Sequence, residues 1–339
     1  MTGFEGSRRR VAVFGAAGHT GRFVVEELRR RGLAPVAVGR RAEALQAAFP
    51  AGVEIRTATV EDAAGLDRAF EGAAAVINCA GPFLDTADAV VSAALRAGAH
   101  YIDVSAEQPS AQAVFDRFDG PARAAGLVVL PAMGFYGGLS DLLVTAAMGD
   151  WTEADDIRIG IGLDRWWPTE GTRVTGARNT APRQVIAAGR LAPLAHPAPR
   201  LAWTFPAPFG AQEMVEVPFS EVVVIARHLK TASLDTFLSE TALKDVRDAA
   251  TPPPEAADDS GLSAQRFVVE TIVRRAGRTR RAVATGRDIY GFTAPLVCEA
   301  VQRLLAGDVR VAGALAPGQV FDAGDLLRSL PFEALAVDL

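Results

Sequence analysis

The chain has 339 residues, of which 49% are hydrophobic, and its formal net charge is −5. This length favours two domains, and the hydrophobic fraction is sufficient for a sizeable core. The charged residues are interspersed along the chain, which argues against a nucleic-acid or anionic-membrane partner, because both need a clustered basic surface.

The potential metal ligands and thiols are scattered. Cys79 and Cys298 are far apart, and the four histidines show no H-x-x-x-H spacing, so neither a disulfide framework nor a metal site is expected. Arg8 to Arg10 resemble the basic start of an export signal, but Gly15 and Gly18 interrupt the short apolar run that follows. These features, together with the lack of a segment long enough to span a membrane, predict a cytoplasmic protein.

The first 130 residues alternate short β-branched runs with amphipathic stretches. Alternating strands and helices are typical of parallel βαβ units, which predicts an α/β, Rossmann-type, doubly wound domain over residues 1–150. The expected strands are 11–14, 35–38, 53–57, 74–79, 100–104 and 127–130, and the expected helices are 20–31, 41–49, 62–70, 86–97 and 110–125.

The pattern changes after residue 150. Longer apolar runs at 157–163 and 221–228, and a hairpin over 267–287 that turns at Ala276-Gly277, predict a mostly antiparallel sheet. A helix is expected over 171–189, and 252–260 is expected to be a surface loop. Residues 151–288 are therefore predicted to form an α+β domain, followed by helices at 293–306 and 325–330.

The first expected strand ends in VFGAAGHTG, with Gly15, Gly18 and Gly21 at intervals of three. Glycine permits the tight strand-to-helix turn and the close approach of a pyrophosphate, and the helix N-terminus attracts the phosphates. The position of the motif within a βαβ unit favours dinucleotide binding over a simple tight turn. The candidate cofactor residues here are Gly15, Ala17, Gly18, His19, Thr20 and Gly21.

The end of the second expected strand indicates which dinucleotide binds. NAD-binding domains usually carry an acidic residue there for the ribose 2′-hydroxyl, whereas this chain has Gly39, Arg40 and Arg41. A guanidinium matches a 2′-phosphate, which predicts NADP(H) as the cofactor. The alternative is that both arginines only solvate the start of a helix.

Further cofactor contacts are expected at the carboxyl ends of the other strands. The segment after the fourth strand is expected to pass beneath the ribose and pyrophosphate and then to turn toward the nicotinamide. Cys79 within it is interpreted as a strand residue and not as a nucleophile. The candidates are Asp62 for the adenine amino group, and Cys79, Ala80, Gly81, Pro82, Phe83 and Ser105.

Together these stretches resemble the saccharopine dehydrogenase-like oxidoreductases. The resemblance rests on GAAGHTG, VGRRAEAL, VINCAGPF, AGAHYIDVSAE and GFYGGLSDLL, and in the tail on GALAPGQVFDAGDLL. It implies NADP(H) binding, a second domain that caps the active site, and a homodimer. It also implies that the C-terminal helices, within 289–339, return to the Rossmann domain. It implies no particular substrate.

The proton donor is not identified by a known motif. Each of the three tyrosines lacks a lysine four residues later, which excludes the Tyr-x-x-x-Lys mechanism of the short-chain dehydrogenases. Tyr136, beyond the sixth strand, is the catalytic candidate, with simple packing as the alternative. Ser140 and Asp141 begin a helix, where capping is the favoured interpretation.

The second domain offers candidate substrate contacts around RWWPTEGTR. Adjacent tryptophans are costly to expose, so they are expected to wall an apolar pocket, or alternatively to pack in a dimer interface or a lid. An arginine nearby is expected to bind a carboxylate of the substrate. His228 is interpreted as a structural histidine. The substrate candidates are Phe135, Trp166, Trp167, Thr172, Arg173 and Arg178.

The sequence therefore predicts an NADPH-dependent oxidoreductase that reduces a small C=N, C=O or C=C substrate between two domains. The alternative is a non-catalytic NADP(H)-binding redox sensor, which the absence of an evident acid–base pair favours. The aromatic WWPTEGT segment favours the enzyme, because a sensor has little need of an aromatic-walled second domain.

Overall fold

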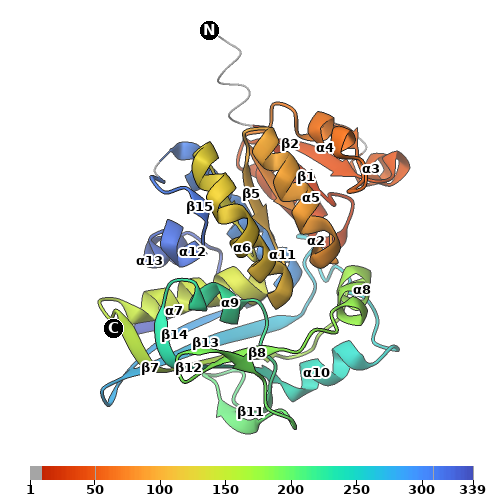
Figure 1. Ribbon diagram of the computed structural model, residues 1–339. Coiled ribbons are helices and arrows are strands. Elements are labelled where there is room, and N and C mark those ends of the chain that lie inside the picture. Colours follow the sequence, from red (N-terminus) through yellow and green to blue (C-terminus); the bar gives the residue numbers. More distant parts are fainter. Residues whose placement is uncertain (1–9, 50, 308, 339) are drawn as a thin grey trace. The chain divides into compact units, whose positions relative to one another are not determined.

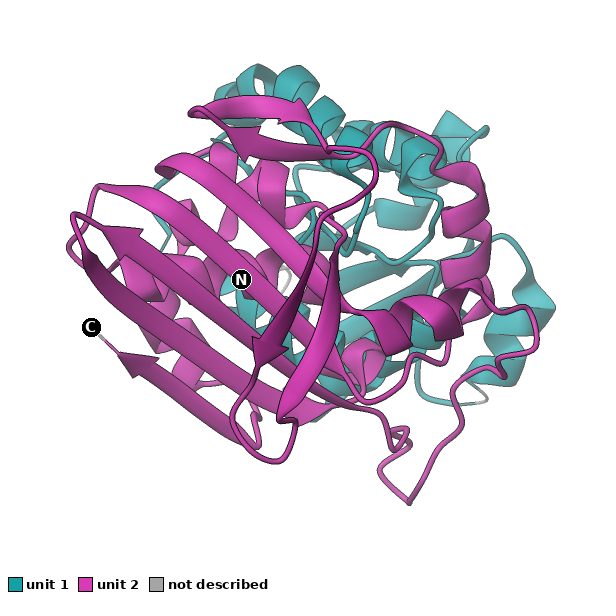
Figure 2. Ribbon diagram, turned by 90° about the horizontal axis from the view of Figure 1, so that it is seen from below, with its two compact units in different colours: residues 1–134, 293–315 teal, residues 135–292, 316–339 magenta. Residues whose placement is uncertain are grey.

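The computed structural model describes residues 10–49, 51–307 and 309–338. The chain divides into two compact units, coloured separately in Figure 2. Unit 1 runs to Gly134 and includes Thr293–Leu315, and unit 2 comprises Phe135–Phe292 and residues from Ala316 onward. Arg8 and Arg9, part of the basic stretch noted in the sequence, lie outside the described residues.

Unit 1 is built on a parallel sheet of seven strands within the described residues, in the order β15-β6-β5-β4-β1-β2-β3. The strand order reverses between β1 and β4, where the dinucleotide site of a doubly wound sheet is found. The strands are β1 (Arg10–Phe14), β2 (Ala34–Gly39), β3 (Glu54–Thr57), β4 (Ala75–Asn78), β5 (His100–Asp103), β6 (Val128–Leu130) and β15 (Gly313–Ala314).

Helices follow the strands of unit 1 and cover its sheet (Figure 1). Helices α4, α5 and α6 pack in series, while α11 lies against α2, where Arg31 and Glu299 form an ion pair of 2.5 Å. The buried faces of these helices are apolar, and this burial is what stabilises them. The helices are α2 (His19–Arg30), α3 (Ala42–Ala48), α4 (Ala63–Phe70), α5 (Phe83–Arg96), α6 (Gln108–Ala125) and α11 (Ile289–Ala306).

Unit 2 is built on a mixed sheet, seen face-on in Figure 2, with nine described strands. The main path runs β10-β11-β12-β7-β13-β14-β16, and β8 pairs with both β12 and β9. Only the β12–β7 pair is parallel among the described pairings of this sheet. The strands are β7 (Glu153–Leu163), β8 (Gln184–Ala187), β9 (Arg190–Pro193), β10 (Arg200–Thr204), β11 (Ala211–Glu216), β12 (Lys230–Ser239), β13 (Arg266–Arg275), β14 (Arg278–Arg287) and β16 (Ala334–Asp338).

The two faces of this sheet are covered differently. One face packs against α7 (Ser140–Met148) and α9 (Glu221–Ala226). On the other face, Trp203 and Phe205 pack over two glycines of β7. A Cβ added to Gly160 would lie 2.7 Å from the Trp203 ring, and one added to Gly162 would lie 2.8 Å from the Phe205 ring. The glycines of β7 thus make room for an aromatic cluster on that face. The remaining helices of unit 2 are α8 (Glu170–Arg178), α10 (Glu240–Arg247), α12 (Pro317–Val320) and α13 (Ala323–Arg328), with a π-helical turn at Phe135–Leu139.

The α/β, Rossmann-type fold with a second, sheet-containing domain is confirmed. Each strand and helix expected in the first 130 residues is present within a few residues of its expected bounds. In the second domain, the hairpin over 267–287 is also present, and both Ala276 and Gly277 have the positive φ that such a turn requires.

Two element assignments in the second domain were wrong. Most of the strand expected over 221–228 is the helix α9, which ends at Ala226, because a short apolar run that is buried on all sides has no diagnostic period. The helix expected over 171–189 ends at Arg178, and Gln184–Ala187 is strand β8. Strand β12 escaped the sequence analysis altogether.

The unit boundaries also differ from those expected. Residues 135–148 belong to unit 2, because α7 packs against β13 and β14 of that unit. Within the expected C-terminal return of 289–339, only residues 293–315 join unit 1. The remainder joins unit 2, where β16 pairs with β14. Among the described helices none has both the length and the apolar character to cross a membrane.

Candidate functional site

The glycine-rich turn of unit 1 is a compact backbone structure between β1 and α2. Gly15 has a φ of +81°, and a Cβ at this residue would lie 2.9 Å from Ala80. A Cβ on Gly21 would lie 2.4 Å from the carbonyl oxygen of Gly15, so α2 crosses the turn closely only because this residue is glycine. The three glycines therefore serve the turn and the helix packing as predicted.

The amino end of α2 has the features of a phosphate site. Gly18 is the N-cap residue and provides no side-chain cap, and the first turn contains no acidic residue. Backbone N–H groups at a helix start attract an anion, and a helix dipole reinforces the attraction. The backbone of this turn, which includes Ala17, His19 and Thr20, thus fits the pyrophosphate of a dinucleotide. A Cβ on Gly18 would lie 3.1 Å from the Gly15 carbonyl oxygen, so this position of the turn is also tightly packed.

Arg40 and Arg41 follow β2 directly, and both are exposed. Arg41 is the N-cap of α3, and Gly39 is the last residue of the strand. Within the described parts of the chain neither guanidinium forms an ion pair with a carboxylate. The pKa of Glu61 is lowered by a hydrogen bond from Thr59, by its own backbone and in part by the charge of Arg40. The pair thus presents positive charge where a 2′-phosphate would be expected.

Asp62 has a local structural role in this structure. It is the N-cap of α4, where its Oδ1 accepts a hydrogen bond of 2.9 Å from the Gly65 N–H, and it pairs with Arg68 at 3.6 Å. These contacts account for an aspartate at this position without any ligand. The proposed contact to an adenine amino group stays a prediction.

The segment Ala80 to Phe83 is held by side chains from three elements. Asn78 accepts from the Ala80 N–H at 3.0 Å, and the Thr86 hydroxyl donates to the Ala80 carbonyl at 2.7 Å. The buried carboxyl of Glu107 accepts from the N–H of Phe83 at 2.7 Å, at the start of α5. The sequence analysis missed Glu107. Because its charge sits at a helix N-terminus, it fixes the path of the segment that includes Gly81 and Pro82.

A buried polar network lies beneath this segment. The Asp103 carboxylate accepts from the Ser105 N–H at 2.9 Å, from the Ala132 N–H at 2.8 Å and from the Tyr101 hydroxyl at 2.9 Å. Burial raises the pKa of Cys79 to about 12, so the thiol stays protonated and is a poor nucleophile. This agrees with the interpretation that Cys79 is not a nucleophile, although the residue lies directly after β4 and not in the strand.

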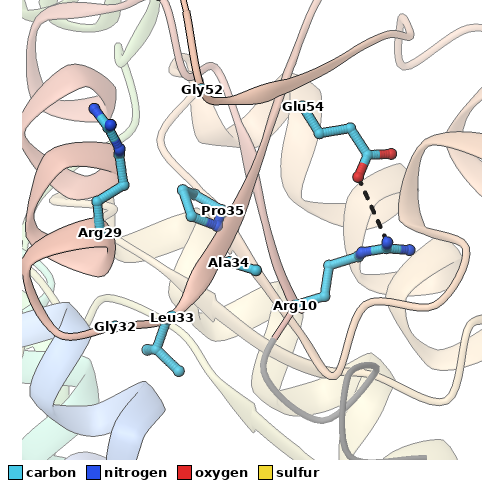
Figure 3. A pocket seen from close by; sticks show the side chains of 8 residues that line it. All are labelled: Arg10, Arg29, Gly32, Leu33, Ala34, Pro35, Gly52 and Glu54. Atoms are coloured by element: carbon cyan, nitrogen blue, oxygen red, sulfur yellow. Dashed lines mark ion pairs between the residues drawn. The ribbon is translucent and has the colours of Figure 1, made fainter. Parts of the chain in front are cut away.

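A surface cavity of unit 1 lies away from these residues. A cavity of about 400 Å3 lies at the amino ends of β1, β2 and β3, where Arg10 pairs with Glu54 at 3.6 Å (Figure 3). None of the predicted cofactor residues lines it. Parallel sheets of this type bind ligands at the carboxyl ends of their strands, so this cavity is not the dinucleotide site.

In unit 2, Tyr136 lies in an aromatic cluster. Its ring centroid is 4.3 Å from that of Phe219 and 5.2 Å from that of Trp166. The Tyr136 hydroxyl is buried and has no hydrogen-bond partner among the described residues. Burial raises its pKa well above the usual value, and the charges of Tyr290 and Glu221 add to this rise. A buried hydroxyl without a partner is uncommon in proteins and is available for a ligand.

Trp166 connects Tyr136 to a group of hydroxyls. Its indole N–H donates to the Tyr290 hydroxyl at 2.9 Å, and the Thr172 hydroxyl lies 2.8 Å from the same oxygen. Thr169 caps α8 and lies 3.0 Å from Thr172, hydroxyl to hydroxyl. The structure thus brings together Tyr136, Trp166 and Thr172 of the predicted site. It adds Tyr290, which lies just after β14 and more than 100 residues away in sequence from these three.

The other predicted substrate residues are placed differently. Phe135 is buried against Phe267, with ring centroids 4.8 Å apart, and contributes to the core. Trp167 diverges from Trp166 and carries the Arg165 guanidinium 5.0 Å from its ring centroid. The expectation that both tryptophans form one wall therefore does not describe unit 2, where only Trp166 contacts the Tyr136 ring.

The two arginines expected to bind a carboxylate have other settings. The Arg173 guanidinium donates to the carbonyl oxygens of Thr251 at 2.6 Å and Asp248 at 3.2 Å. It therefore braces the loop after α10. Arg178 is exposed in the last turn of α8, a helix with no buried residue. A carboxylate contact for either residue stays a prediction.

A third arginine and a glutamate, both missed in the sequence, lie next to Phe219, whose ring contacts Tyr136. The Arg183 guanidinium is 5.0 Å from the centroid of the Phe219 ring and donates to the Pro218 carbonyl at 2.6 Å. Glu221 is fully buried, and its Oε1 accepts from the Phe219 N–H at 2.9 Å. Burial raises the pKa of Glu221 to about 7 against the opposing effects of that hydrogen bond, the nearby Thr236 hydroxyl and the Arg183 charge. The misassignment of 221–228 as a strand concealed this residue.

His228 pairs with a buried aspartate. Its Nε2 lies 2.6 Å from Asp141 Oδ1, and Asp141 Oδ2 accepts from the Gly318 N–H at 2.7 Å. Burial lowers the pKa of His228, but the charge and hydrogen bond of Asp141 outweigh this effect and raise it overall. The pair links α7, the end of α9 and α12, which agrees with a structural His228. The N-cap of α7 is Leu139, and no side chain of the described residues caps this helix, so the capping interpretation of Ser140 and Asp141 was wrong.

Comparisons with known proteins identify the nucleotide-binding part. Residues 11–126 match the family described as saccharopine dehydrogenase NADP binding domain. A saccharopine dehydrogenase-like oxidoreductase of Bos taurus is 29% identical over 145 residues, which cover 37% of this chain and 34% of that protein. A lipid droplet localized protein of Caenorhabditis elegans is 31% identical over 143 residues, which cover 38% of this chain and 34% of that protein. The match therefore spans about a third of the length of these relatives.

A solved structure extends the likeness of fold beyond that region. Apo saccharopine dehydrogenase (L-Glu forming) from Saccharomyces cerevisiae superposes with a TM-score of 0.68, at 14% identity. The alignment covers 97% of this chain and 100% of the yeast chain. At that identity the match shows a shared fold, which includes the second sheet, and does not establish a shared substrate.

The expected cytoplasmic location was wrong. The C. elegans relative is named as localized to lipid droplets, and a relative in Arabidopsis thaliana, 30% identical over 142 residues, is named as a probable mitochondrial saccharopine dehydrogenase-like oxidoreductase. Scattered cysteines and a broken apolar run describe the folded chain, and they do not determine where a cell places it.

Proposed function

We propose that this chain, whose residues 11–126 match the saccharopine dehydrogenase NADP binding domain, is an NADPH-dependent reductase of a small C=N, C=O or C=C compound. Unit 1 holds the cofactor, and the Tyr136 cluster of unit 2 holds the substrate. The expected placement of the substrate between two domains, the homodimer and a substrate carboxylate remain predictions.

Unit 1 supplies binding and orientation. The turn from Gly15 to Gly21 accepts the pyrophosphate on backbone N–H groups, and Arg40 with Arg41 neutralises the 2′-phosphate. When bound, NADPH supplies the hydride. The segment Ala80 to Phe83, fixed by Asn78, Thr86 and Glu107, has a single path along the carboxyl end of β4, where it orients the nicotinamide half.

Unit 2 supplies the proton. The phenol of Tyr136 is neutral at physiological pH, because burial keeps its pKa well above the usual value. Its hydroxyl lacks a partner among the described residues, so it is available to donate to the oxygen or nitrogen that gains charge as the substrate is reduced. Trp166 and Phe219 pack against the ring and hold it in place.

The observation that carries this proposal is the combination of a glycine-rich turn at Gly15 to Gly21 with two arginines, and no carboxylate, at the end of β2. Calorimetric titration with NADPH and NADH tests the cofactor. We expect NADPH to bind at least tenfold more tightly, and equal affinities would contradict the proposal.

Catalysis is tested by incubating the protein with NADPH and a panel of imines, enones and keto acids, and by following the loss of NADPH absorbance. Consumption with at least one compound is expected. Tight NADPH binding without consumption on any of them would favour a redox sensor, because a sensor needs the cofactor site but not the proton donor.

A further inference from the structure

The turn Pro218 to Glu221 holds Tyr136 from one side. The Phe219 ring stacks on the Tyr136 ring at 4.3 Å, and the Ser220 hydroxyl donates to the Tyr136 backbone carbonyl at 3.0 Å. The turn is itself closed by Glu221, whose Oε1 accepts from the Phe219 N–H at 2.9 Å. Three consecutive residues therefore connect the Glu221 carboxyl to the position of the tyrosine.

The second oxygen of the same carboxyl has no such partner. Glu221 is fully buried, and Oε2 has no hydrogen-bond partner among the described residues. An ionised carboxylate in this setting is costly, because burial disfavours the charge and the hydrogen bond to Oε1 offsets this only in part. The carboxyl therefore holds its proton up to a pH near 7, the pKa that its burial produces.

The surroundings of Glu221 include few charges. From the elements packed against α9, Arg183 precedes β8, Arg190 begins β9 and is exposed, Tyr136 belongs to the π-helical turn, and β12 presents the neutral Thr236. Helix α7 contributes Asp141, which is held in its pair with His228. Of these groups Tyr136 is the one whose hydroxyl both lacks a partner and responds to the charge of Glu221.

We propose that Glu221 is a positioning residue for Tyr136, which holds the Phe219–Ser220 turn against the tyrosine and adds a negative charge near its hydroxyl when it ionises. Below pH 7 the carboxyl is neutral, and Tyr136 gives up its proton most readily. Above pH 7 the carboxylate makes the phenolate harder to form, so Tyr136 becomes a weaker acid. The catalytic part of this inference rests on the proposed function, and the coupling of the two residues does not.

The coupling is tested without any substrate. The chain contains three tyrosines, so a protein labelled with carbon-13 at tyrosine Cζ gives three signals, which Tyr→Phe variants assign. We expect the Tyr136 signal to shift with a midpoint near pH 7. In Glu221→Gln, which retains an acceptor for the Phe219 N–H, this step should be absent.

The matched control is Glu216→Gln. Burial raises the pKa of Glu216 to about 7 as well, with a contribution from Asp235, but its strand partner Phe237 belongs to the aromatic cluster on the opposite face of the sheet. The Tyr136 step should persist in this variant. A Tyr136 signal that does not move near pH 7 in the wild type, or a step that survives Glu221→Gln, would overturn the proposal, whether or not the variant is stable.

Turnover separates this proposal from the proposed function. With any compound that the protein reduces, kcat should fall about tenfold for each pH unit above 7 if the ionised form is inactive, and this fall should be absent in Glu221→Gln. An NMR step together with a flat kcat profile in the wild type would remove Tyr136 as the proton donor while the coupling to Glu221 stands.

Discussion

The candidate sites of the two units are built from different parts of the chain. In unit 1 the proposed nucleotide cradle is the backbone of one short segment, Gly15 to Gly21, whose close packing requires that the three glycines carry no side chain. In unit 2 the Tyr136 cluster consists of side chains from segments as far apart as Tyr136, Phe219 and Tyr290. We therefore expect the site of unit 1 to lose function when a Cβ is added to a glycine, and the site of unit 2 to lose function when the Tyr136 hydroxyl is removed.

The difference extends to how each site holds a charge. Unit 1 offers helix N–H groups and exposed arginines, which suit a large and permanently charged ligand. Unit 2 keeps Glu221 and the phenol of Tyr136 neutral by burial, which suits a group that exchanges a proton. Four experiments can break or sharpen this comparison, the first of which carries the largest expected effect.

The largest effect is expected in unit 2, when the hydroxyl oxygen of Tyr136 is removed. Tyr136→Phe is expected to lower turnover by about 10²–10⁴-fold, because a positioned proton donor contributes that much to a reduction. The ring contacts with Phe219 and Trp166 remain, so the fold and NADPH binding should be unaffected. Steady-state kinetics and calorimetry measure the two separately, and unchanged turnover would leave water or the substrate as the proton source.

In unit 1 the largest loss of NADPH affinity is expected when a Cβ is added to a glycine of the turn. In Gly21→Ala the new Cβ would lie 2.4 Å from the Gly15 carbonyl oxygen, so the turn must shift. Overpacking of this kind costs about 1–3 kcal/mol, and we expect NADPH affinity to fall about 100-fold. Gly120→Ala in α6 is the matched control, because a Cβ there meets nothing within 4 Å. It should bind NADPH normally, and equal losses in both variants would contradict the cradle.

Removal of a cofactor arginine should have an intermediate and selective effect. A charge-assisted hydrogen bond to the 2′-phosphate contributes about 1.5–3 kcal/mol, which corresponds to roughly 10–200-fold in affinity. Arg40→Ala should therefore weaken NADPH binding by that factor and leave the poor binding of NADH nearly unchanged. Calorimetric titration with both nucleotides measures this, and a parallel loss for NADH would indicate a general structural effect of the substitution.

The smallest expected effect concerns two histidines whose pKa values shift in opposite directions on folding, so that their contributions to stability depend on pH in opposite ways. In unit 2 Asp141 raises the pKa of His228, so the stability that the pair provides is complete below pH 6.5 and is lost as pH rises through the folded-state pKa. In unit 1 burial lowers the pKa of His100, whose Nδ1 accepts from the Val128 N–H at 3.0 Å. Its contribution is complete above pH 6.5 and is lost as pH falls.

Urea unfolding at several pH values measures both contributions. The difference in unfolding free energy between the wild type and His228→Gln should shrink as pH rises from 6 to 9. The difference for His100→Gln should shrink as pH falls from 7 to 5. Differences that stay constant with pH would show that neither pKa changes on folding.

Much of unit 1 was predictable because its signals are local. The strand VAVF, the glycine spacing and the arginines at the end of β2 all lie within residues 11–41, and each acts through its immediate neighbours. In unit 2 the same approach failed at EVVVIARH, which is apolar and β-branched but forms α9. Its burial on all sides comes from packing against other elements, which no local period reports.

The sequence by itself determined the Rossmann sheet, the glycine turn and the choice of arginine over a carboxylate at position 40, because these depend on backbone freedom and on charge at fixed offsets from a strand. Only the tertiary structure decided that Glu221 and Arg183 lie next to the Phe219 ring that contacts Tyr136, that Tyr290 binds Trp166, and that Arg173 braces a loop. The physical reason is that burial and unpartnered polar atoms are properties of a packed interior, where residues distant in sequence determine one another's chemistry.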